Sequence, residues 1–160
     1  MNETLQELSK KMAELDTSQN AIEGCSKEIL DIAKADESRM EDLAKMWKSY
    51  CLSKSNKIPC LYLVNDIVQN SAFQKLALHD IFYPHIVEAF PRVYHTGNNK
   101  IKIEIVRLVD IWADRKVYPE ENLNHLRQML AILPNIDNIN NPLVIPYLIN
   151  NNFKIPSKLI

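Results

Sequence analysis

One stretch of the chain gathers several kinds of polar side chain on one face of a predicted helix. Tyr62, Asp66 and Asn70 are four residues apart in turn, so a helix brings them onto the same face. Asn65 and Gln69 lie on the adjacent row. A carboxamide donates and accepts hydrogen bonds and a carboxylate accepts them, which suits them to holding a peptide backbone. The pattern therefore predicts a peptide-binding groove. The alternative is that these groups bond to neighbouring helix ends inside the fold.

A second face further along the chain carries two arginines. Arg107 and Arg115 are eight residues apart, which places them on one side of a helix. Residues 92–116 hold six basic and three acidic residues, so this region carries +3 in a chain whose net charge is −1. Guanidinium groups match phosphate oxygens in bidentate fashion, so the two arginines predict a phosphate site. The alternative is an ion pair with a local carboxylate, and Arg107 has fewer acids at helical spacing than Arg115.

The remaining histidines, cysteines and carboxylates form no catalytic or metal-binding set that we recognise. The four histidines lack the i,i+4 pairing and the H-E-x-x-H spacing of zinc ligands. The three cysteines form no C-x-x-C pair, and two of them fall on apolar stripes where cysteine acts as a small hydrophobe. We predict a protein that is not an enzyme and needs no cofactor. Its thiols are expected to be reduced, as in the cytoplasm or nucleus.

Helices must position these groups, because the chain has only two glycines. So few glycines argue against Gly-rich phosphate loops and against turn-dense β folds, which need positive φ angles repeatedly. Apolar residues recur at spacings of three and four. They predict helices over about 4–15, 18–34, 73–94, 99–115 and 119–133, with two more beginning near residues 38 and 59.

Local signals refine these boundaries. Ser18, or the threonine before it, is expected to cap the second helix, and residues 38–41 have the form of a capping box. Phe73 is expected to point inward from the fifth helix, which the prolines at 84 and 91 should kink or end locally. The fourth segment is apolar around most of its circumference, so we expect it near the centre of the fold.

The chain as a whole predicts an all-α superhelical or bundle domain over residues 1–134. Residues 135–160, rich in asparagine and proline, form a second segment that we expect to be partly ordered and to add a last helix at most. Apolar residues make up 46% of the chain, enough for a core, and the small net charge argues against binding duplex nucleic acid by bulk electrostatics. No apolar run approaches the roughly 20 residues that span a bilayer, and the polar, charged first eleven residues predict no signal peptide.

Two of these stretches resemble the signatures of CTD-interacting domains, which bind the heptad-repeat tail of RNA polymerase II. They are LYLVNDIVQNS at residues 61–71 and RLVDIWADRKVY at residues 107–118. A third, weaker match is TSQNAI at residues 17–22. The matches follow the family's order and spacing from about residue 5 to 133. The chain departs from many members after residue 71, where neutral residues stand in place of lysine or arginine.

The resemblance implies a right-handed superhelix of seven to eight helices, similar to the ENTH and VHS domains, with a groove that holds the tail as a β-turn. In the family, the residue matching Asp66 hydrogen-bonds the peptide near its tyrosine and turn. The residues matching Asn65 and Asn70 hold the peptide backbone. The residue matching Val117 lies near the peptide's proline or tyrosine. Other groove-lining positions are Tyr62, Ser18, Gln19 and Ile22.

The resemblance also implies how phosphate is read and where the protein works. The arginine matching Arg107 contacts a phosphoserine, and Arg115 matches another basic position near phosphate. We therefore expect a nuclear module that binds the phosphorylated tail in a groove between the second, fourth and seventh helices. Its role would lie in termination, RNA 3′-end processing or phosphatase recruitment, together with RNA-processing factors.

Two other functions fit the sequence less well. The first is a membrane-trafficking adaptor, for which the acidic leading helix is poorly suited because anionic membranes attract basic segments. The second is direct RNA binding, which requires surface aromatic residues beside basic residues. In this sequence only Tyr94 and Tyr118 suggest such an arrangement. We expect no membrane partner and weak or absent RNA binding.

Overall fold

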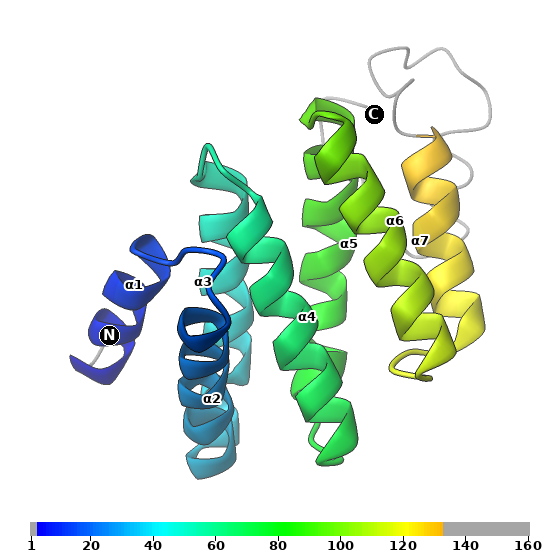
Figure 1. The fold of residues 1–160 in the computed structure, drawn as a ribbon. Helices are drawn as coiled ribbons and strands as arrows, with labels where there is room; N and C mark the ends of the chain where they lie inside the picture. Colours follow the sequence, from blue (N-terminus) through cyan, green and yellow to red (C-terminus); the bar gives the residue numbers. More distant parts are fainter. Residues whose placement is uncertain (1–2, 133–160) are drawn as a thin grey trace, which may run out of the picture.

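The computed structural model describes residues 3–132, which form seven α-helices and one 3-10 turn and contain no strand (Figure 1). The predicted all-α class is confirmed for this part of the chain. The predicted segment 135–160 lies outside the described residues. In chain order the helices are α1 (Glu3–Ala13), α2 (Gln19–Ala35), η1 (Glu37–Arg39), α3 (Met40–Ser53), α4 (Ile58–Phe73), α5 (Leu78–Thr96), α6 (Asn99–Asp114) and α7 (Glu120–Ile132).

The helices follow one another across the molecule, from α1 at one end to α7 at the other (Figure 1). The α4 helix lies in the middle and contacts α2, α3, α5 and α6. Leu61, Leu63, Val64, Ile67 and Val68 are fully buried by these neighbours. The predicted central place of this helix is therefore confirmed, and its polar residues occupy the half-buried remainder of its circumference.

Aromatic side chains form the centre of the core and fix the position of α6. Trp112 is fully buried on α6 and stacks on Phe90 of α5 with a centroid distance of 5.5 Å. Tyr118, in the loop before α7, meets the Trp112 ring edge-on at 5.7 Å. Such pairs contribute about 0.5–1.5 kcal/mol beyond their buried area. The packing around Trp112 holds α6 beside α4.

The two helices that flank α4 at the site begin with side-chain caps. Ser18 Oγ accepts a hydrogen bond from the backbone N–H of Ala21 at 3.3 Å, which confirms Ser18 as the cap of α2. Asn98 Oδ1 accepts from the N–H of Ile101 at 3.0 Å at the start of α6. Caps of this kind contribute about 1 kcal/mol each and define where each helix begins.

The α4 and α6 helices end in the same way. Lys75 and Lys116 follow them with φ angles of 58° and 55°, the left-handed conformation that closes a helix C-terminus. In each case the next N–H reaches back to a carbonyl five residues earlier, from Leu76 to Ser71 and from Val117 to Trp112, both at 2.9 Å. The chain thus leaves both helices abruptly.

The predictions for Phe73 and Ser38 are wrong, and so is the expectation that the prolines end α5; a kink at either proline stays a prediction. Phe73 is the last residue of α4 and is 86% exposed, because the chain turns there and α5 begins only at Leu78. The prolines at 84 and 91 lie inside α5, which continues through both while packed along α3, α4, α6 and α7. Ser38 caps nothing: its N–H donates to Asp36 Oδ1 at 3.1 Å, and α3 starts without a side-chain cap.

Candidate functional site

A pocket with a volume of about 330 Å³ opens between the start of α2, α4 and α6. Six of its eight lining residues were predicted as site residues from the sequence. The groove was expected to include the seventh helix, but the third wall comes from α6, because Arg107 lies on that helix. The lining residues are Thr17, Gln19, Ile22, Glu23, Tyr62, Asn65, Asp66 and Arg107.

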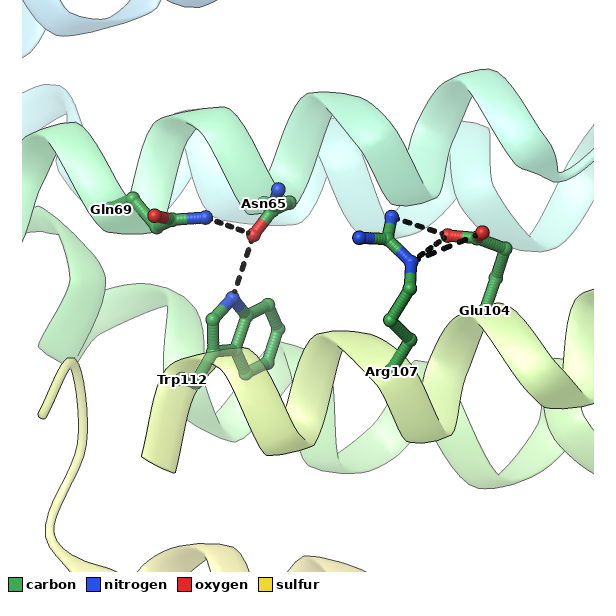
Figure 2. Close-up of polar contacts among 5 residues, drawn as sticks. All are labelled: Asn65, Gln69, Glu104, Arg107 and Trp112. Atoms are coloured by element: carbon green, nitrogen blue, oxygen red, sulfur yellow. Dashed lines mark hydrogen bonds and ion pairs between the residues drawn. The ribbon is translucent and has the colours of Figure 1, made fainter. Parts of the chain in front are cut away.

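The carboxamide of Asn65 is held in one orientation by two donors (Figure 2). Its Oδ1 accepts from the Trp112 indole Nε1 at 3.0 Å and from Gln69 Nε2 at 2.6 Å. Because an indole N–H only donates, the Asn65 atom facing it must be the oxygen. The –NH2 group points away from Trp112 and makes no hydrogen bond within residues 3–132. Asn65 therefore presents a donor to anything that enters the pocket.

Asp66 presents the complementary chemistry. Asn70 Nδ2 donates to the Asp66 backbone carbonyl at 2.8 Å and to Asp66 Oδ2 at 3.1 Å. The other carboxylate oxygen accepts no hydrogen bond from the described residues and remains as an acceptor in the pocket wall. Asp66 and Asn70 are both half-buried, so neither is sealed inside the core. Donor and acceptor thus stand side by side on α4, as the backbone of a bound peptide requires.

Arg107 faces the same pocket, but it is already paired. Its Nη2 lies 2.8 Å from Glu104 Oε2, and its Nε donates to both carboxylate oxygens at 3.2 Å (Figure 2). This hydrogen bonding raises the pKa of Arg107 further above its usual value, so it is a permanent cation. The nitrogen that has no partner in Figure 2 lies on the side of the guanidinium nearer Asn65.

The two arginines reverse the expectation about ion pairs. Arg107 was the arginine with fewer acids at helical spacing, yet it is the one that pairs with a carboxylate three residues earlier. Arg115 instead donates from Nη1 to Gln69 Oε1 on α4. Arg115 does not line the pocket, and its contact supports the Gln69 side chain that in turn holds Asn65. A phosphate contact for Arg115 stays a prediction.

The structure places the other predicted residues at or behind the pocket. Gln19, Ile22 and Tyr62 line it. Ser18 does not line the pocket but lies between two lining residues in the sequence, and its hydroxyl caps α2. Val117 is buried at 6% exposure in the core and does not line the pocket. Peptide contacts for these residues remain predictions.

Sequence reasoning did not assign three residues to the site. Thr17 and Glu23 line the pocket, and Glu104 holds Arg107. Gln69 was placed on the polar face beside Asn65, but its hydrogen bond to Asn65 was not predicted. Glu104 was detectable, because glutamate and arginine three residues apart on a helix form a standard pair. The contact from Arg115 to Gln69 joins two helices, and helical periodicity carries no information about it.

The cysteines and Tyr118 are buried and do not line the pocket. All three cysteines are buried, as predicted for Cys51 and Cys60, and burial raises the pKa of Cys25 to about 12. Tyr118, considered above as a surface aromatic for RNA, is 4% exposed and donates to the His79 carbonyl at 2.6 Å. Residues 3–132 hold no group of three metal-ligating side chains, and no helix among them is long and apolar enough to span a bilayer.

The comparison with known families decides the assignment. The CID domain model matches residues 6–126, well over half of the chain. This chain belongs to the CID domain family. These are the CTD-interacting domains that the sequence signatures resemble, a family of interaction domains, and the match favours them over membrane-trafficking adaptors.

Curated relatives are similar to this chain over a stretch about as long as the CID domain match. "Regulation of nuclear pre-mRNA domain-containing protein 1A" of Homo sapiens is 32% identical over 125 residues, which cover 77% of this chain and 39% of the relative. "Regulation of nuclear pre-mRNA domain-containing protein 1B" of Mus musculus is 30% identical over 122 residues, which cover 75% of this chain and 36% of the relative. "UPF0400 protein C337.03" of Schizosaccharomyces pombe is 26% identical over 124 residues, 76% of this chain and 31% of the relative. The chain therefore spans less than half the length of each of these relatives.

Proposed function

We propose that the pocket between α2, α4 and α6 binds the phosphorylated heptad-repeat tail of RNA polymerase II. The observation that carries this proposal is the meeting of Asn65, Asp66 and Arg107 in one pocket, from two different helices. An amide donor, a carboxylate acceptor and a cation are the groups that a phosphorylated turn of peptide needs. The CID family and the names of the relatives support a role in regulating nuclear pre-mRNA.

In this proposal different residues of the pocket contact different parts of the peptide. Asn65 donates to a peptide carbonyl and Asp66 accepts from a peptide N–H or from the tyrosine hydroxyl. Ile22 and the ring of Tyr62 provide apolar surface for the peptide's proline or tyrosine. Arg107 takes the phosphate on its nitrogens that Glu104 leaves unoccupied.

The affinity for a single site is expected to be micromolar. A short flexible ligand must be ordered on binding, and that cost offsets part of the contact energy. Tandem repeats in the tail would then raise the apparent affinity by increasing the effective concentration of the second site. Nuclear location and a role in termination, 3′-end processing or phosphatase recruitment belong to the same proposal.

Titration with two-repeat peptides tests the proposal. Peptides are either bare or phosphorylated on one serine, and binding is followed by calorimetry. Hydrogen bonds to charged groups contribute about 1.5–3 kcal/mol, so Arg107→Ala should weaken the best phosphorylated peptide about tenfold or more. The bare peptide should change less than about twofold, because it lacks the phosphate.

Arg92→Ala is the matched control, because Arg92 is an exposed arginine on α5 outside the pocket. It should leave both affinities unchanged. Equal affinity of the wild-type protein for bare and phosphorylated peptides would exclude phosphate reading by Arg107.

A further inference from the structure

Glu104 forms an ion pair with Arg107, the residue to which the proposed function assigns phosphate binding. The carboxylate side chain is only 15% exposed, whereas that of Arg107 is 47% exposed. Three hydrogen bonds join them, and they occupy Nε and one side of Nη2. A sheltered carboxylate is screened weakly by solvent, so its charge acts on the guanidinium and on any anion beside it.

We propose that Glu104 is a specificity-determining residue that makes the site accept a phosphate and refuse a carboxylate. The inference rests on the proposed function of the pocket. Glu104 neutralises the charge of Arg107 in the free protein. An incoming group must therefore bring more charge and more acceptor oxygens than the carboxylate already present.

The free donors of Arg107 show why Glu104 opposes every anion. Both N–H bonds of Nη1 and one of Nη2 remain unpaired within the described residues. A phosphate either shares the guanidinium through these donors or displaces Glu104 from it. In the first case the phosphate is repelled by the nearby carboxylate, and in the second it must break an existing ion pair.

The charge of the whole pocket opposes anions in general, so the acceptor oxygens of the ligand carry the selection. Glu23 and Asp66 line the pocket, and Arg107 is the single basic residue among its eight lining residues. With Glu104 added, carboxylates outnumber the cation, and their field repels a dianion more than a monoanion. A ligand carboxylate has the same charge and the same two oxygens as Glu104, so it gains little by replacing it. A phosphoserine brings three strong acceptor oxygens and a charge of about −1.5 to −2 into direct contact with the guanidinium, so it gains more from the donors of Arg107.

The test compares three peptides, with serine, phosphoserine or glutamate at the same position, on the wild-type protein and on Glu104→Gln. Glutamine keeps the shape and one acceptor oxygen but removes the charge. Glu104→Gln should bind the phosphoserine peptide about fivefold more tightly, as expected for removing one partly buried charge contact. It should also begin to bind the glutamate peptide better than the serine peptide, which the wild-type protein should not do.

Asp110→Asn is the matched control. Asp110 lies on the same helix as Glu104, pairs with Arg127 at 3.1 Å and does not line the pocket. The substitution removes one charge from α6 without freeing Arg107, so its effect on the phosphoserine peptide should be under about twofold. In an Arg107→Ala background the gain from Glu104→Gln should disappear.

The outcomes separate this inference from the proposed function. If wild type prefers the phosphorylated peptide and Arg107→Ala loses that preference, the function stands. Unchanged or weaker phosphopeptide binding by Glu104→Gln would then overturn the role of Glu104 alone. A wild-type preference for the glutamate peptide over serine would overturn it as well. If neither protein distinguishes phosphorylated from bare peptide, both proposals fail.

Discussion

At the scale of the single residue, the role of Asn65 depends on which way its side-chain amide points. The Trp112 indole and Gln69 fix the oxygen, so the nitrogen is the group left to donate to a ligand in the proposed function. A neutral hydrogen bond contributes about 1 kcal/mol net, or roughly fivefold in affinity.

Asn65→Asp tests that role, because aspartate keeps the acceptor for Trp112 and loses the donor. Binding of the bare peptide, measured by fluorescence anisotropy, should weaken about threefold or more, while the melting temperature changes little. Unchanged binding would show that the Asn65 amide nitrogen does not hold the peptide.

The sequence predicts much of the residue-scale picture, but not how the polar groups pair. Helical periodicity alone places Tyr62 and Asp66 on one face, and both line the pocket. The orientation of Asn65 depends on Trp112, which is 47 positions away in the sequence. Arg115 likewise reaches across to another helix. Partners that meet only after helices pack leave no periodic signal in the sequence.

At the scale of the elements, the two glycines make opposite contributions. A Cβ at Gly24, on the exposed side of α2, would meet nothing within 4 Å. A Cβ at Gly97, between α5 and α6, would lie 2.6 Å from Ile101 Cγ2 and 2.7 Å from the Val93 carbonyl oxygen. Gly97 therefore allows the close approach that turns α5 into α6, and Gly24 allows nothing of the kind.

The pair of alanine substitutions tests this difference. Gly24→Ala should raise the free energy of unfolding by about 0.5–1 kcal/mol, because glycine weakens a helix interior. Gly97→Ala should lower it by about 1–3 kcal/mol, because a backbone oxygen must move. Urea denaturation measures both changes, and a stabilised Gly97→Ala protein would contradict the packing described for this turn.

Helix interiors were predicted better than helix ends. The boundary between α4 and α5 was misplaced because Phe73 and the residues after it continue an apolar pattern, while the left-handed Lys75 ends the helix. The prolines at 84 and 91 were expected to kink or end α5, yet the helix does not end at either, and it packs against four other helices. Tertiary packing overrides local preference at the prolines, whereas a local C-terminal turn ends α4.

At the scale of the whole molecule, stacking in chain order brings α2, α4 and α6 to one pocket. A second pocket of about 520 Å³ lies between α1 and α3, lined in part by Leu5, Met46 and Tyr50. The two pockets share no lining residue. These two pockets are therefore distinct, and the proposed function uses only the first.

Amide chemical-shift mapping with one phosphorylated two-repeat peptide tests the central claim most directly. The account predicts that the largest changes fall on residues of the first pocket, among them Gln19, Asn65, Asp66 and Arg107. Changes concentrated around Met46 and Tyr50 in the second pocket, with the first pocket unaffected, would contradict it.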